Sequence, residues 1–214
     1  MLAELTRDQL KSIIRDVVTS VLKQEKPPIP IGASNRHIHL TAEDYFALFG
    51  NEPFENVKDL GQPGEFASNK LLEIEGPKRS VKGVRILGPF RKVSQVELSN
   101  TDARALGINA PTRLSGDIEG TPGITLIGPK GRLEIPHGAI VAQRHIHMTP
   151  ADAALFEVKN GDMLNILVDG ARPTIFANTI VRVADNFKLE MHLDTDEANA
   201  VGVNSDMFGK VIKL

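Results

Sequence analysis

Apolar and polar residues alternate in short runs along most of the chain after Pro30, and Gly, Pro, Asn and Asp separate these runs. Alternation with a period of two predicts half-buried β-strands. The predicted strands lie within SVKGVRILG, QVEL, GITLIG, GAIVAQRHIHM, MLNILVDG, PTIFANTIVRVA, FKLEMHL and KVIKL. Because turn residues return roughly every 8 to 12 positions, the pattern favours barrels or sandwiches over β-α-β units.

The first residues follow a different pattern, since apolar positions recur there at helical spacing. Residues 1–24 therefore predict one amphipathic helix, which Pro27 and Pro28 end. Its apolar stripe consists of Leu10, Ile13, Ile14, Val17, Val18 and Val21, and its capping box and hydrophobic staple consist of Thr6, Gln9, Leu5 and Leu10. Two alternatives remain open: the helix packs on its own domain, or it binds a partner such as a second subunit or an enclosing assembly.

Two short helices are expected further along, where Thr41 can cap AEDYFALF and Thr149 can cap PADAALF. Residues 51–70 contain several Gly and Pro positions and are expected to form an irregular surface segment.

Composition excludes several classes of protein. A net charge of -2 over 214 residues argues against general binding to nucleic acid or to membrane surfaces. No apolar run approaches the roughly 20 residues that span a bilayer, and no signal peptide is recognisable, so a cytoplasmic protein is expected. The chain has no cysteine, so any metal must be held by His, Asp or Glu, and a cysteine nucleophile is excluded.

One octet occurs twice: SNRHIHLT at residues 34–41 returns as AQRHIHMT at residues 142–149. A second match follows in the same order, between residues 83–108 and 179–203. Each of these segments has a Val-Arg strand, a second strand and a turn into a helix. In this alignment Glu97 of VEL falls on His192 of MHL.

Each copy therefore carries His-x-His followed by one further potential metal ligand. The two sets are His37, His39 and Glu97, and then His145, His147 and His192. Side chains at i and i+2 of a strand share a face, and three protein ligands leave a position open for water or substrate. Nitrogen and oxygen donors of this kind suit zinc, and less specifically cobalt, nickel or iron. The alternative is paired histidines retained from an old duplication, which does not readily explain a Glu in one copy where the other has a His.

The remaining candidates are the sixth histidine and three arginines. His137 has no counterpart in the repeat and is expected to be structural. Arg36 and Arg144 precede the histidine pairs, and binding an anion or pairing with a carboxylate are equally open for them. Arg91 follows the turn LGPF, six residues before Glu97. On such a loop a guanidinium could hold a phosphate with two hydrogen bonds, the alternative being a solvated surface arginine.

From about Ile29 to its end the chain resembles the PduL-type phosphate propanoyltransferases, the phosphotransacylases of bacterial microcompartments. The resemblance rests on SNRHIHL, GPFRKVSQVELSNTDARALGI, RLSGDIEGTPG, AQRHIHMTPADA and EMHLDTDEANA. It implies a mainly β fold of two small β-barrel domains capped by short helices and preceded by the N-terminal amphipathic helix. One barrel would comprise residues 27–35 with 143–214 and the other residues 36–142. Residues 1–26 would be a possible encapsulation peptide.

The same resemblance implies a dinuclear zinc site between the barrels. His37, His39 and Glu97 would hold one zinc ion, His145, His147 and His192 the other, and Arg91 would handle phosphate. The substrates would be inorganic phosphate and a short-chain acyl-CoA, propanoyl-CoA or acetyl-CoA, converted reversibly to acyl phosphate and coenzyme A. One methylene is worth only about 1 kcal/mol in a pocket, so the sequence does not decide the acyl length. A homodimer and microcompartment shell or core proteins are the expected protein partners.

Without a cysteine nucleophile, we expect a phosphate oxygen to attack the thioester carbonyl directly, with the metal ions as Lewis acids. Two other functions remain open at this stage. One is a metal-dependent hydrolase of acyl phosphates or thioesters, which would release CoA without phosphate. The other is a non-catalytic, metal-stabilised microcompartment component, which chelation would unfold and which would turn over no acyl-CoA.

Overall fold

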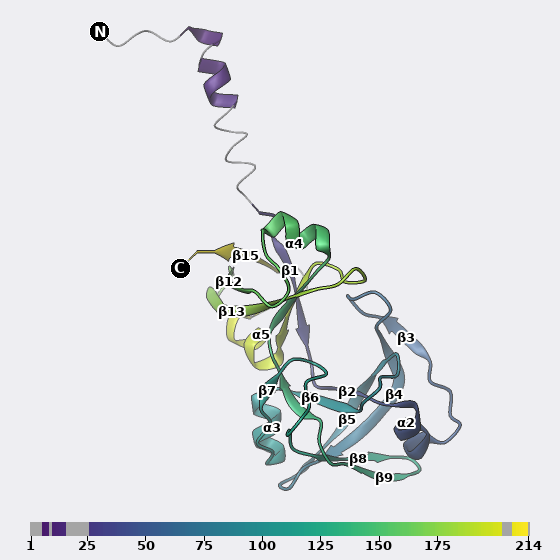
Figure 1. The fold of residues 1–214 in the computed structure, drawn as a ribbon. Helices are drawn as coiled ribbons and strands as arrows, with labels where there is room; N and C mark the ends of the chain where they lie inside the picture. Colours follow the sequence, from purple (N-terminus) through teal and green to yellow (C-terminus); the bar gives the residue numbers. More distant parts are fainter. Residues whose placement is uncertain (1–5, 9, 16–25, 203–206, 214) are drawn as a thin grey trace.

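The computed structural model describes residues 6–8, 10–15, 26–202 and 207–213. Within them the chain is mainly β, with one sheet closed into a barrel and a second sheet curled into a half-barrel (Figure 1). Short helices lie at the ends of strands. The expected fold class is confirmed. No helix in these residues has the length and apolar character needed to cross a membrane.

The closed barrel combines the first strand of the chain with strands from its C-terminal part. Its strands are β1 (Ile29–Ser34), β11 (His145–Met148), β12 (Met163–Val168), β13 (Thr174–Val183), β14 (Glu190–Asp194) and β15 (Phe208–Ile212), in the order β1-β14-β11-β13-β12-β15. Alternate residues of these strands point inward, as Ile29 and Ile31 of β1 do, and form one hydrophobic core.

The second sheet is formed by the middle of the chain. Its strands are β2 (His37–His39), β3 (Asn56–Asp59), β4 (Phe66–Glu75), β5 (Ser80–Gly88), β6 (Gln95–Leu98), β7 (Thr112–Arg113), β8 (Ile124–Gly128), β9 (Gly131–Ile135) and β10 (Ala139–Ala142). They follow the order β7-β10-β6-β2-β5-β4-β8-β9, and β3 pairs with β4. A separate hydrophobic core lies within this sheet.

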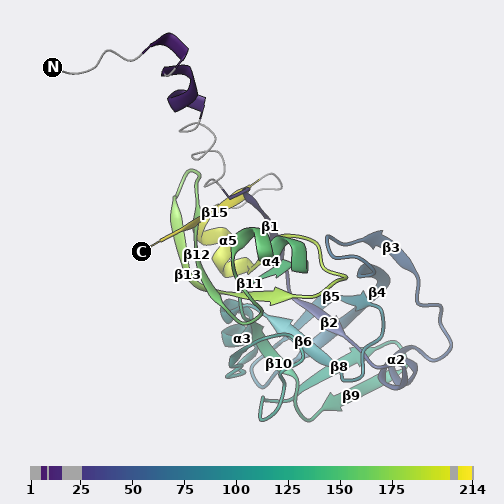
Figure 2. The same cartoon turned by 45° about the horizontal axis from the view of Figure 1, so that its top comes forward.

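The chain passes from one sheet to the other at each octet. β1 belongs to the barrel and β2 to the second sheet, and the chain returns between β10 and β11. Both views place β12, β13 and β15 at one end of the molecule and β8 and β9 at the other, with β1 leading from one sheet into the other (Figures 1 and 2). The division into two domains at residues 35 and 142 stays a prediction.

The expected helices form where the sequence signals place them. α2 (Ala42–Phe49) is capped by Thr41, whose side chain accepts a hydrogen bond from the backbone N–H of Asp44. α4 (Pro150–Phe156) is capped by Thr149 in a complete capping box with Asp152. The two Thr-Asp turns begin α3 (Asn100–Leu106) and α5 (Thr195–Val201).

Two expectations need correction or restriction. Residues 51–70 are not irregular throughout, because β3 and the first part of β4 form there as an antiparallel pair. In the N-terminal segment, residues 7–8 and 10–15 are helical, and about half the surface of Leu10, Ile13 and Ile14 is exposed. Leu5, Gln9, Val17, Val18 and Val21, which complete the expected cap and stripe, lie outside the described residues, as does Val203 at the end of the second repeat.

Candidate functional site

The first histidine pair lies on β2, the strand between β5 and β6. β2 runs parallel to β5 and antiparallel to β6, and His37 is paired directly with Glu97. His37 and His39 share one face of the strand because side chains alternate. One potential ligand atom from each of His37, His39 and Glu97 lies within 4.8 Å of the others. The structure therefore brings together the first set that the sequence predicted.

The second pair repeats this arrangement on β11. That strand runs parallel to β13 and antiparallel to β14, and His145 is paired directly with His192. The ring centroids of His145, His147 and His192 are 4.6, 5.1 and 4.8 Å apart in pairs. Their potential ligand atoms also lie within 4.8 Å of one another. The alignment of Glu97 with His192 thus corresponds to equivalent positions in the two sheets.

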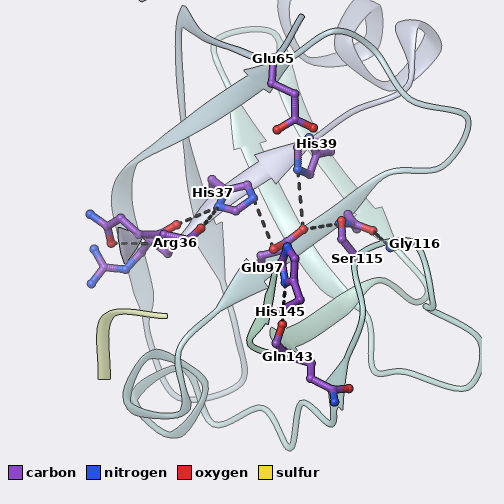
Figure 3. Close-up of polar contacts among 12 residues, drawn as sticks. Arg36, His37, His39, Glu65, Glu97, Ser115, Gly116, Gln143 and His145 are labelled. Atoms are coloured by element: carbon purple, nitrogen blue, oxygen red, sulfur yellow. Dashed lines mark hydrogen bonds and ion pairs between the residues drawn. The ribbon is translucent and has the colours of Figure 1, made fainter. Parts of the chain in front are cut away.

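Both sets line the same cavity, which has a volume of about 650 Å³ and receives residues from both sheets. Arg91 lines it as well. Figure 3 shows Glu97 at the meeting point of contacts from His37 and His39, with His145 of the second set drawn in the same region. The duplicated sequence therefore forms one site with two halves.

Backbone carbonyls fix the ring orientation of the outer histidine in each pair. Nδ1 of His37 lies 2.8 Å from the carbonyl oxygen of Asn35, and Nδ1 of His145 lies 2.9 Å from that of Gln143. A carbonyl only accepts hydrogen bonds, so each Nδ1 carries a hydrogen, which leaves Nε2 as the nitrogen that can meet a further ligand. This is the arrangement by which metal-binding histidines are oriented.

The second histidine of each pair, His39 or His147, has a buried nitrogen without a hydrogen-bond partner in the described residues. In both rings this nitrogen is Nδ1. Buried polar atoms are normally paired, so these two atoms call for a further partner. Together with Nε2 of His37 and Nε2 of His145, they make both sets fit a metal ion.

Burial and charge keep most of these imidazoles neutral. Burial, the neighbouring His192 and Arg182 lower the pKa of His145 to about 4, although a hydrogen bond to Gln143 acts in the opposite direction. Burial, His145, His192 and Arg182 lower the pKa of His147 further, to about 2. A neutral imidazole is the form that binds metal, and at neutral pH His145 and His147 are in that form.

The first half contains a carboxylate, and its electrostatics differ accordingly. Burial acts to raise the pKa of Glu97, but His37 and His39 hold it well below its usual range. Burial acts to lower the pKa of His37, but the charge of Glu97 raises it overall. Burial and His37 hold the pKa of His39 well below 6.5. Glu97 is therefore an ionised acceptor.

A polar residue two positions before the third member supports it in each half. Nε2 of Gln95 donates to Oε1 of Glu97 over 2.6 Å, and Oε2 of Glu190 lies 2.8 Å from Nε2 of His192. Gln62, from the segment between β3 and β4, donates to the same Glu190 oxygen over 3.0 Å. Sequence reasoning missed Glu190, although i and i+2 spacing from His192 was a usable signal.

Arg91 faces the cavity with two partners. Its guanidinium donates to Oγ of Ser115 over 2.8 Å and to Oε1 of Glu65 over 3.0 Å. Its backbone N–H donates to the carbonyl of Leu40, which ties the loop after β5 to the strand end carrying His39. Glu65 was not expected at the site, because nothing in the sequence predicts that residues 60–65 fold back toward β2.

The other basic candidates have structural partners. Arg36 pairs with Asp102 over 2.8 Å and Arg144 with Glu197 over 2.6 Å, so for both the carboxylate alternative is the one observed. Asp102 and Glu197 occupy the same position in α3 and α5, three residues after the caps Ser99 and Asp194. His137 is exposed and lies outside both sets.

Comparison with known proteins gives consistent matches. A family model described as phosphate propanoyltransferase matches residues 30–204. Curated proteins named phosphate propanoyltransferase are 51% identical in Citrobacter koseri, over 94% of this chain and 98% of that protein, and 49% identical in Salmonella typhimurium, over 97% and 99%. One from Citrobacter freundii is 52% identical over 91% of this chain and 94% of its own length.

Proposed function

The chain belongs to the phosphate propanoyltransferase family, and from this membership we propose that it transfers a propanoyl group from coenzyme A to inorganic phosphate, reversibly. One observation carries the proposal at the level of the site. Two three-residue donor sets and Arg91 line a single cavity, so a thioester carbonyl and an anionic nucleophile can meet there.

We propose that two zinc ions are held by His37, His39 and Glu97 and by His145, His147 and His192. The unpartnered Nδ1 atoms of His39 and His147 and the nitrogen-oxygen donor sets support this choice. When bound, zinc supplies a Lewis acid for the thioester carbonyl and for the sulfur of the departing coenzyme A.

The residues of the chain orient and neutralise the attacking phosphate. Arg91 binds it through its guanidinium, with Ser115 fixing the direction of one nitrogen. A phosphate oxygen attacks the carbonyl carbon, a C–O bond forms, and the C–S bond breaks. Hydrogen phosphate gives up its one proton over the reaction and the CoA sulfur ends with one, so the step balances without an outside acid. No covalent acyl-enzyme is formed.

The experiment follows CoA release from propanoyl-CoA by the metal-loaded protein, with and without inorganic phosphate, and identifies the acyl product. We expect CoA release to require phosphate and to yield propanoyl phosphate. Equal release in both conditions would mean hydrolysis, and no release in either would mean a non-catalytic role. A trapped acyl-enzyme would overturn direct attack. The same assay with acetyl-CoA measures the acyl preference, and we expect acetyl-CoA to be accepted.

The N-terminal segment supports a proposal about partners. Leu10, Ile13 and Ile14 are each about half exposed, as is suitable for an apolar stripe that binds another protein. We propose that it targets the enzyme to microcompartment shell or core proteins. Co-purification with shell proteins, compared between the full chain and one lacking residues 1–26, tests this. The expected homodimer is tested by light scattering.

A further inference from the structure

Arg182 on β13 faces the cavity, although the sequence alignment gave it no role. Ile38 is paired with Ile86, and Ile146 with Val181, so these partners occupy equivalent positions in the two halves. Arg85 consequently lies opposite His37, whereas Arg182 lies opposite His147. The Val-Arg pairs of the two repeats are thus offset by two residues. Because side chains in a strand alternate, this offset keeps both arginines on the cavity face.

The cavity arginines differ in how they are neutralised. Arg36 is paired with Asp102, Arg91 with Glu65, and Arg85 donates to the carbonyl of Ser68. In the described part of the chain, the guanidinium of Arg182 makes no hydrogen bond and no ion pair.

What holds the Arg182 side chain in place is an aromatic contact. Its Cζ lies 5.6 Å from the ring centroid of Phe187, and the Phe187 ring lies 4.2 Å from that of His147. Cation-π contact orients a guanidinium without using its five N–H donors. These donors remain available beside the second histidine set.

Each histidine set also has its own arginine. Arg91 lines the cavity together with the first set, and Arg182 lies opposite His147 of the second set. Arg91 and Arg182 both line the cavity, and the carboxylates of Glu65 and Glu97 line it as well. Arg91 is paired with Glu65, whereas Arg182 is paired with no carboxylate among the described residues, so an anion in the cavity would offset the charge of Arg182.

We propose that Arg182 is a second phosphate-binding residue, holding the substrate phosphate from the side of the second histidine set while Arg91 holds it from the first. This inference rests on the proposed function, which supplies phosphate as substrate. Coenzyme A also carries phosphates, but these lie at the nucleotide end, remote from the thioester sulfur. Arg182 lies opposite His147, where the reacting groups meet, and this favours the phosphate that reacts.

The test uses the full chain loaded with metal and the variants Arg182→Gln and Arg182→Lys. Arg172→Gln is the matched control, because it removes an equal charge from an exposed residue just before β13. We expect Arg182→Gln to raise the KM for phosphate by roughly 10- to 100-fold, as for the loss of a charge-assisted hydrogen bond. The KM for propanoyl-CoA should change less than about twofold, since no contact to coenzyme A is lost. Arg182→Lys should fall in between.

Calorimetric titration with inorganic phosphate alone provides a readout without turnover, and Arg182→Gln should weaken binding by the same factor. Unchanged phosphate affinity in Arg182→Gln would overturn the inference. So would a rise in the KM for propanoyl-CoA that disappears with propanoyl-pantetheine, because the arginine would then bind the nucleotide phosphates. Loss of metal from both variants would overturn it as well. If wild-type protein neither binds phosphate nor needs it for CoA release, the proposed function itself fails.

Discussion

The two halves of the site share one strand arrangement but differ in charge. In each, a His-x-His strand lies between a parallel and an antiparallel neighbour, and the antiparallel neighbour supplies the third member. That member is Glu97 in the first half and His192 in the second. The residue two positions earlier differs to match, since Gln95 donates to a carboxylate and Glu190 accepts from an imidazole.

This difference shows what duplication preserves. Each half keeps one carboxylate at these two positions. In the first half it is Glu97, the third member of the set, and in the second half it is Glu190, which supports the third member His192. A carboxylate behind a histidine, as Glu190 lies behind His192, fixes the orientation of the ring. Glu97 itself belongs to the first set, so it would bring its negative charge directly to a bound ion. If each half holds an ion, as we propose, the two ions meet unequal charge, so changes in the two halves should have unequal effects.

The largest effect is expected from removing one inner histidine at a time. His39→Ala and His147→Ala each remove one ligand from one half, so each should lose one metal ion and keep the other. Activity should fall at least about 1,000-fold in both, because a bound metal supplies several kcal/mol of charge stabilisation. Metal analysis and the phosphate-dependent CoA assay measure the two quantities. If either variant retained both ions, the ligand set of that half would be wrong.

Changing the supporting residues should affect the two halves very differently. Gln95→Glu puts a second buried carboxylate next to Glu97, where Nε2 now lies 2.6 Å from Oε1, and should cost about 3–5 kcal/mol of stability or metal affinity. Glu190→Gln keeps an oxygen for His192 and should weaken metal binding only about 10-fold. Competition with a chelator measures the affinity, and urea unfolding measures the stability. If Gln95→Glu and Glu190→Gln changed the metal affinity and the stability equally, the two halves would not differ in their electrostatics.

Much of this site could be predicted from the sequence because it depends on residues that lie close together in the chain and on the repeat. Two histidines two residues apart share a strand face whatever the rest of the fold, and the repeat alignment supplied Glu97 and His192. The caps Thr41 and Thr149 likewise act within their own helices. Local rules of this kind extend from a sequence to a structure without knowledge of the tertiary contacts.

The residues that were missed depend on long-range packing. Gln62 and Glu65 reach the site because residues 60–65 fold back across it, and Gln62 bonds to residues more than a hundred positions away. The repeat alignment matched Arg182 with Arg85 because each follows a valine, and residue identities alone do not reveal the strand register. Only the pairing of β11 with β13 puts Arg182 opposite His147.

His37 and His145 should respond to acid with opposite sign in the metal-free protein. The pKa of His145 falls from 6.5 unfolded to about 4 folded, so its neutral form stabilises the fold above pH 6.5, and this contribution is lost as the pH falls from 6.5 to 4. The pKa of His37 is raised, so its contribution is present below pH 6.5 and is lost as the pH rises through the folded value.

Urea unfolding between pH 7 and pH 4 measures this difference. We expect the free energy of unfolding of His145→Gln to fall by about 3 kcal/mol less than that of the wild type between pH 6.5 and pH 4, which is the equivalent of the pKa shift of His145. His37→Gln should make the same loss steeper. Parallel profiles for the two variants would show that the charge of Glu97 does not distinguish the halves.

The smallest effect is expected at the ion pairs behind the site. Asp102 is almost fully buried against Arg36, and its Oδ2 has no partner in the described residues, so Asp102→Asn should cost about 1–2 kcal/mol. Burial raises the pKa of Glu197, so the folded state already disfavours its charge, and Glu197→Gln should cost less than about 0.5 kcal/mol. Metal content should be unchanged in both variants, and urea unfolding of the metal-free protein measures the difference. A larger loss of stability in Glu197→Gln than in Asp102→Asn would contradict this expectation. The ion pair of Arg144 with Glu197 would then stabilise the fold more than the ion pair of Arg36 with Asp102.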